Sequence, residues 1–187
     1  MISVQEQRDR RGAGSERIRV LGAIWGVAGI AAVLVYAALS LGKHAIYAVS
    51  TGLSPLEWLL LVANCIFMAW AEGYRGFQLR FSPRVAARAL HVHEHPTLPR
   101  LLLAPLFCTG YFGATARLKN TVWIGTGLIV AAVLLFNQMP QPWRGILDAG
   151  VMVGLSWGTV SLLVAAWATW RRRQALVAAE VPAMAGL

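Results

Sequence analysis

Four long apolar blocks constrain this chain more than any other feature. They cover residues 20–41, 55–74, 121–139 and 149–170. A helix rises about 1.5 Å per residue, so a block of about twenty residues matches a hydrocarbon core about 30 Å thick. The apolar residues come in blocks and are not spread at the spacing of a core-facing stripe. We therefore predict an all-α polytopic membrane protein, with four transmembrane helices forming one domain over residues 20–170.

The composition argues against a water-soluble domain. Of the 187 residues, 57% are hydrophobic and 13% are charged, which leaves too little polar surface to cover a folded chain in water. The two cysteines, Cys65 and Cys108, both lie in apolar segments. The sequence therefore offers no disulfide framework and no Cys-x-x-Cys motif for metal or redox chemistry.

The start of the second block carries a clear helix signal. In Ser54-Pro55-Leu56-Glu57 the serine can cap free amides, the proline fits the first turn, and the glutamate can close a capping box. We expect this helix to end near Tyr74, where Gly73 and Gly76 weaken it and arginines accumulate.

The segment between the second and third blocks is basic and interrupted. Ser82-Pro83 predicts another capped helix start, and a helix from there would place Arg84 and Arg88 on one face, as in an interfacial helix. Residues 101–116 are apolar but short, and Pro105 and two glycines interrupt them. We expect residues 83–116 to form an interfacial or re-entrant hairpin on the cytoplasmic side, covered by other protein.

The 17 Lys and Arg residues favour four spans over five, because short basic loops stay in the cytoplasm. With four spans, only Lys43 and Arg144 lie outside. If residues 101–116 also crossed, Arg117, Lys119 and the cluster at residues 171–173 would move outside, and this five-span topology is the alternative.

We therefore expect both termini to lie in the cytoplasm, and the protein to lie in the inner membrane of the cell. Residues 1–19 are expected to form a flexible basic tail, and residues 171–187 a second cytoplasmic tail. The first block is longer than the apolar region of a cleaved signal peptide, so we interpret it as an uncleaved helix. The net charge of +9 comes from cations that flank apolar blocks. This predicts contact with anionic lipid headgroups on the cytoplasmic side and no nucleic-acid partner.

Glycines spaced four apart mark helix contacts. Gly150, Gly154 and Gly158 form a repeated small-x-x-x-small pattern in the last block, and Gly22 and Gly26 show the spacing once in the first. Such stripes let another helix backbone approach closely. The sequence leaves open whether the partner helix belongs to this chain or to another protein.

Three polar residues of the second block are candidates for an intramembrane role. Glu72 and Arg75 lie three apart and are expected to form an ion pair at the membrane boundary. The alternative is a carboxylate that handles a proton or substrate, since an ionisable group at membrane depth is a site candidate. Asn64 lies nearest the membrane centre and is expected to hydrogen-bond across a helix interface.

The run His91-Val92-His93-Glu94-His95 is a weak candidate for a metal site. In a strand all three imidazoles would share a face, whereas in a helix only His91 and His95 align. No distant ligand cluster accompanies them, and we expect solvated histidines. No P-loop, dinucleotide fingerprint, hydrolase triad or metalloprotease motif occurs.

Two sequence blocks resemble those of an uncharacterised family of small bacterial integral membrane proteins. One is Ala71-Glu72-Gly73-Tyr74-Arg75-Gly76-Phe77-Gln78 with Phe81-Ser82-Pro83-Arg84, and the other is Gln141-Pro142-Trp143-Arg144-Gly145-Ile146 with Asp148-Ala149-Gly150. The resemblance covers a minor part of the chain. It implies a membrane protein of bacterial source and implies no activity.

These patterns favour a non-enzymatic integral membrane protein that serves as an accessory or assembly subunit. Its expected partners are other membrane proteins or further copies of itself, and no cofactor is predicted, although lipid or pigment contacts remain open. A small-solute or ion transporter or channel-like oligomer is the first alternative. A membrane enzyme that modifies lipid headgroups is the second.

Overall fold

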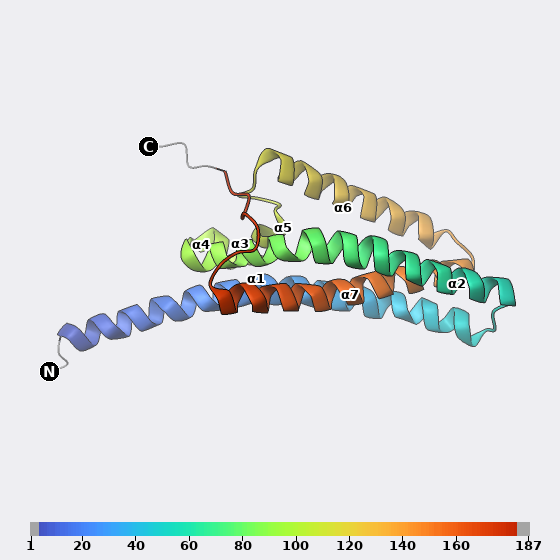
Figure 1. The fold of residues 1–187 in the computed structure, drawn as a ribbon, viewed down its shortest axis with the longest axis horizontal. Helices are drawn as coiled ribbons and strands as arrows, with labels where there is room; N and C mark the ends of the chain where they lie inside the picture. Colours follow the sequence, from blue (N-terminus) through green and yellow to red (C-terminus); the bar gives the residue numbers. More distant parts are fainter. Residues whose placement is uncertain (1–3, 183–187) are drawn as a thin grey trace.

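The computed structural model describes residues 4–182, with side chains from residue 16 onward, and these residues form helices without any strand (Figure 1). The elements follow one another in the order α1 (Val4–Ser50), α2 (Pro55–Met68), η1 (Ala69–Phe81), α3 (Ser82–Glu94), α4 (Leu98–Leu102), α5 (Ala104–Thr109), α6 (Ala116–Asn137) and α7 (Trp143–Arg172).

Four helical stretches are long and apolar enough to cross a membrane. They are Glu16–Ser50, Pro55–Glu94, Ala116–Asn137 and Trp143–Arg172, so the all-helical class and the four candidate spans are confirmed. Between the second and third stretches, α4 has 5 residues and α5 has 6. Helices of that length cannot cross a bilayer, so the five-span alternative is wrong for this fold.

The first helix is longer than predicted. Residues 4–19 were expected to be a flexible tail, and the first predicted helix ended at residue 41, but residues 4–19 and 42–50 also belong to α1. The stretch contains no proline, and the glutamate, glutamine and arginine residues before the apolar block favour a helix. The remaining part of the predicted tail, residues 1–3, lies outside the described residues.

The second helix begins as predicted. The Ser54 hydroxyl accepts the Glu57 amide hydrogen at 3.4 Å, and the Glu57 carboxylate accepts the Ser54 amide hydrogen at 2.7 Å. This reciprocal pair is a capping box, and Pro55 follows it in the first turn.

The same helix does not end near Tyr74. It continues through the π-helix η1 and through α3 to Glu94, so the separate interfacial helix predicted after Ser82 is also wrong. In η1 the hydrogen bonds close wider turns, as between the Ser82 amide and the Phe77 carbonyl. Pro83 stands where this wider register changes back to α, so its missing amide hydrogen does not break the helix.

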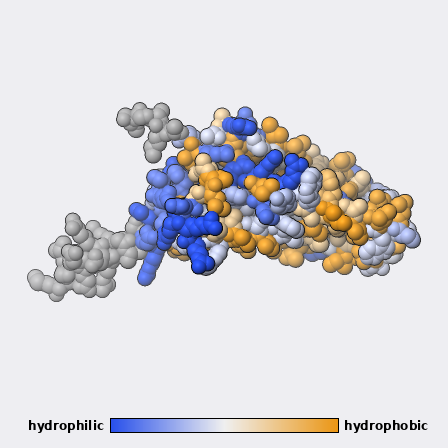
Figure 2. Space-filling view, viewed as in Figure 1, coloured by the Kyte–Doolittle hydropathy of each residue, from blue (hydrophilic) through white to orange (hydrophobic). Residues whose placement is uncertain are grey.

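Helix α7 lies at the centre of the bundle and packs against α1, α2, η1 and α3. Figure 1 shows the beginning of α1, α3 to α5, the beginning of α6 and the end of α7 at one end of the molecule. The turns that join α1 to α2 and α6 to α7 lie toward the other end. Hydrophilic side chains gather toward the first end, and apolar ones cover most of the remaining visible surface (Figure 2). Among the residues whose side chains the structure describes, the cations of the elements at this end include Arg17, Arg19, Arg84, Arg88, Arg100, Arg117, Lys119, Arg171, Arg172 and Arg173.

The segment predicted to form a hairpin packs on the glycine face of α1. A Cβ atom added to Gly22 would overlap Leu101, and one added to Gly26 would lie 2.8 Å from the Cys108 sulfur. At Gly29 it would lie 2.6 Å from Pro105. The glycines of the first block therefore hold α4 and α5 against α1 at close range.

We expect Gly26→Leu to destabilise the bundle by about 1–3 kcal/mol, because the new side chain would displace α5. Thermal unfolding of the purified protein in detergent measures the effect. Gly125→Leu is the matched control, since nothing lies within 4 Å of a Cβ at that position. Equal unfolding temperatures of the two variants would contradict the packing described for α5.

Candidate functional site

The glycine face of α7 packs against the second long helix of the same chain. A Cβ at Gly154 would lie 2.6 Å from a Glu72 carboxylate oxygen, and one at Gly73 would lie 2.8 Å from the Trp157 ring. The contacts along this face are Gly150 with Asn64 and Met68, Gly154 with Glu72, and Gly158 with Phe77. The structure thus answers the question left open by the sequence, since the groove is filled within the chain.

Asn64 donates hydrogen bonds across this interface. Its amide nitrogen lies 2.8 Å from the Ile146 carbonyl oxygen and 3.4 Å from that of Leu147. Both carbonyls belong to the first turns of α7, so the side chain joins the two helices. This contact holds the helices in register and occupies the donors of Asn64 inside the protein.

Glu72 and Arg75 do not pair, and the predicted boundary ion pair is wrong. The wider turn of η1 moves residues three apart out of line with each other, whereas an α-helix would align them. Arg75 lies over the Trp70 ring, 5.0 Å from its centroid. One Glu72 oxygen is buried beside Gly154 and has no hydrogen-bond partner among the described atoms.

Two further polar contacts join the second long helix to α7, and neither was predicted from the sequence. The Trp157 indole donates to the Gln78 side-chain oxygen at 2.9 Å, and the hydroxyls of Ser82 and Ser161 lie 3.1 Å apart. In the sequence, the two contacts could have been indicated only by the spacing of Gln78 and Ser82, which lie four residues apart and so share a helix face. Because the helix was expected to end near Tyr74, this shared face was not predicted.

The histidine run does not gather into a metal site. His91 and His95 stack with ring centroids 4.6 Å apart, as expected for a helix. His93 points elsewhere, with its Nε2 3.0 Å from a Glu16 carboxylate oxygen and its ring edge against Trp170. Over the part of the chain that the structure describes, no three histidine, cysteine or acidic side chains meet in a group that could hold a metal ion.

Arg88 is fully buried, although the sequence suggested an exposed interfacial face for it. Its guanidinium lies over the Phe107 ring at 4.1 Å and donates to backbone carbonyl oxygens from two segments. The acceptors are Phe107 at 2.7 Å, Phe112 at 3.0 Å, Gly113 at 2.9 Å, Ala179 at 2.8 Å and Glu180 at 3.4 Å. Arg88 therefore fastens the loop after α5 and the segment after α7 to α3.

We expect Arg88→Leu to lower the free energy of unfolding by at least about 3 kcal/mol, because several buried carbonyls lose a charged donor. It should also expose residues 174–182 to proteolysis. Thermal unfolding in detergent and limited proteolysis measure the two effects. Arg84→Leu on the same helix is the control, because the Arg84 side chain makes no hydrogen bond to the described residues, and equal behaviour of the two variants would contradict the anchoring role.

A second buried charge joins α1 to α7 at the opposite end of the bundle. Asp148 is 2% exposed, and its carboxylate lies 2.9 Å from the His44 Nδ1 and 3.7 Å from the Arg144 Nε. His44 belongs to α1, so only the packing of α1 on α7 brings its imidazole to Asp148.

Helix α6 differs from the other three long helices because it has few contacts with the other described helices. It is held near its start, where Leu118 packs by Gly110 and the Tyr111 hydroxyl lies 2.6 Å from that of Thr126. Leu118 is its one buried residue, and a Cβ at Gly125 or Gly127 would meet no described atom within 4 Å. Figure 1 shows α6 leaning away from the bundle.

Exposed Gly127 and Ala131 lie four apart on α6 and repeat the small-x-x-x-small spacing. In the sequence, this pair is a weaker pattern than the glycine stripes of the first and last blocks. Those stripes are occupied within the chain, whereas this one is open.

Comparisons with protein-family models, with curated proteins and with solved structures found no match to this chain.

Proposed function

We propose that the chain is a non-enzymatic, multi-pass accessory or assembly subunit of the bacterial inner membrane, with α6 as its contact with another membrane protein. The observation that carries the proposal is the unpacked state of α6 beside three long helices that pack closely on one another. Four apolar helices fit a multi-pass membrane protein. The basic end of the bundle supports a cytoplasmic position for the beginning of α1 and the end of α7.

The packing of membrane helices explains why α6 is the proposed contact. In lipid there is little hydrophobic gain when helices associate, so close backbone approach through small residues supplies much of the attraction. Gly22, Gly26 and the α7 glycines already make such contacts inside the chain. Gly127 and Ala131 present the same geometry outward, which suits a transmembrane helix of a partner protein.

We expect the double change Gly127→Leu with Ala131→Leu to reduce the amount of co-purified partner by at least about tenfold, because the larger side chains block close approach. The measurement is gentle-detergent purification followed by native mass spectrometry, which reports partners and stoichiometry together. The bundle itself should unfold at an unchanged temperature, since this part of α6 packs on nothing inside the chain.

Val133→Leu is the matched control, because this exposed residue adds bulk elsewhere on α6. Purification of the unaltered protein as a monomer without partners would contradict the proposal. So would recovery of the same amount of partner with the Gly127→Leu, Ala131→Leu double variant as with Val133→Leu. Masses that showed only further copies of this chain would replace an accessory role with self-association.

A second candidate is proton- or ion-coupled transport, and it rests on the buried, unpartnered Glu72 oxygen beside Gly154. An ionisable group at this depth is a natural carrier of a proton. We expect Glu72→Gln to abolish flux in proteoliposomes loaded with a pH-sensitive dye if this function holds. Glu94→Gln, on an exposed residue of α3, serves as the control. Flux that survived Glu72→Gln unchanged would remove Glu72 from the mechanism.

A further inference from the structure

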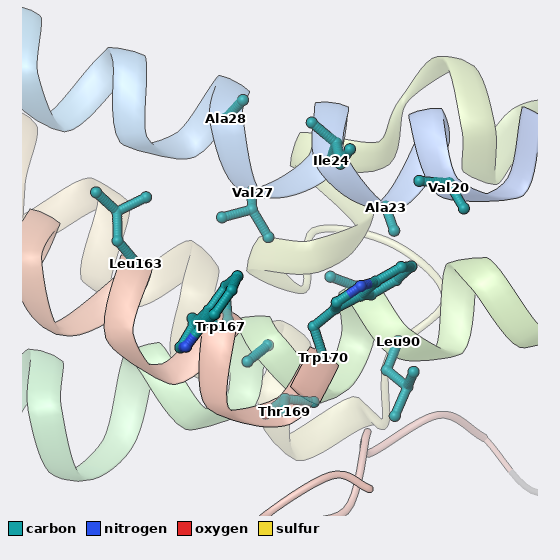
Figure 3. A pocket seen from close by; sticks show the side chains of 13 residues that line it. Val20, Ala23, Ile24, Val27, Ala28, Leu90, Leu163, Trp167, Thr169 and Trp170 are labelled. Atoms are coloured by element: carbon teal, nitrogen blue, oxygen red, sulfur yellow. The ribbon is translucent and has the colours of Figure 1, made fainter. Parts of the chain in front are cut away.

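An apolar groove runs between α1 and α7 at the basic end of the bundle, with α3 as its floor (Figure 3). Its volume is about 420 Å³. In Figure 3 the indoles of Trp167 and Trp170 project from α7 toward α1. Along α1 the groove follows residues 20–28, which corresponds to about 12 Å of helix.

The groove is deep at its floor and open at its rim. Ala23, Ala86 and Ala89 are 6% exposed or less, and these small side chains leave the space. On the two walls, Ile24 is 56% exposed and Trp167 is 67% exposed. The groove therefore opens sideways to whatever medium surrounds the helices, and its lining is almost entirely hydrocarbon.

Cations stand at the end of the groove that lies nearest the start of α1. Arg19 precedes the groove residue Ala23 by one helical turn, and its Nε atom is buried without a hydrogen-bond partner among the described atoms. Arg173 lies over the ring of Trp170, 4.8 Å from the centroid. The neighbouring acidic residue, Glu16, is already paired with His93 at 3.0 Å. The end of the groove thus offers positive charge beside an apolar channel.

We propose that this groove holds one acyl chain of an anionic phospholipid, whose phosphate is bound by Arg19 and Arg173. This site is independent of the partner contact proposed for α6. A helix is about 10–12 Å across, so a 12 Å length of it occupies roughly 900 Å³ and is too bulky for the groove. A single hydrocarbon chain is thin enough, and the charge at the end of the groove matches a phosphate rather than a neutral lipid.

A second groove, between η1, α7 and Leu176, shows why charge decides the matter. It is larger, at about 760 Å³, and its lining includes Gln78, Ser156 and Ser161; as in the first groove, no lysine or arginine belongs to the lining itself. Apolar space alone therefore does not select an anionic lipid. The first groove differs in the cations beside it, because Arg19, whose Nε has no partner among the described atoms, precedes Ala23 by one turn, and Arg173 lies over the lining residue Trp170.

The test is native mass spectrometry of the full chain in detergent, titrated with phosphatidylglycerol or with phosphatidylcholine of the same acyl chains. We expect one phosphatidylglycerol to be retained with at least about fivefold preference, since each nearby arginine strengthens attraction to an anionic lipid by about that factor. Arg19→Gln with Arg173→Gln should weaken phosphatidylglycerol retention by at least about tenfold. Arg171→Gln with Arg172→Gln removes the same charge and should leave it unchanged.

A second measurement locates the acyl chain. Phosphatidylglycerol with a photoreactive group in its acyl chain should label peptides that contain residues 20–28 and 163–170. Ala166→Leu fills the groove and should reduce that labelling without changing the unfolding temperature. No preference between the two lipids, equal effects of the two double variants, or labelling confined to other helices would each overturn the proposal.

Discussion

Large apolar side chains cover the outside of this bundle. This apolar exterior determines which kinds of contact can hold the helices together. Ile46, Leu128 and Trp167 are each at least two-thirds exposed, and similar residues line α2 and α6. In water, exposing such apolar surface would cost about 25 cal/mol of free energy for each Å², whereas in hydrocarbon it would not. In hydrocarbon the helices gain little by hiding apolar groups from the solvent, so their contacts must come from close packing and polar bonds.

The interior supplies both kinds of contact. Glycines bring α7 against α2 and η1, and bring α4 and α5 against α1, at distances that any Cβ would prevent. Several polar side chains inside the bundle are hydrogen-bonded to backbone, as Asn64 is to Ile146 and Arg88 is to the carbonyls around it. Such bonds are worth most where water cannot compete for them. Helix α6 has neither kind of contact over most of its length, which distinguishes it as a surface for another molecule.

The structure could be predicted from the sequence wherever the pattern is formed by residues that lie close together in the chain. The apolar blocks predicted the helical class and the four candidate spans, and Ser54 with Glu57 predicted the start of the second helix. The ends of helices were predicted less well, because Gly73, Gly76 and Pro83 weaken a helix locally while the packing of η1 and α3 against α7 keeps it continuous. Arg88, His44 and the Glu16–His93 contact could not be found, since their partners lie far away in the chain and only tertiary packing brings them together.

Labelling with a membrane-impermeant maleimide in intact cells shows whether a membrane surrounds the bundle. Single cysteines would replace the exposed residues Arg17, Thr51, Arg117 and Gln138 in a chain carrying Cys65→Ala. Cys108 should stay silent, because burial raises the pKa of its thiol to about 12. We expect labelling at positions 51 and 138 in intact cells, and at positions 17 and 117 only after permeabilisation. Labels that placed positions 17 and 117 on opposite faces, or a chain that stayed dissolved without detergent, would contradict it.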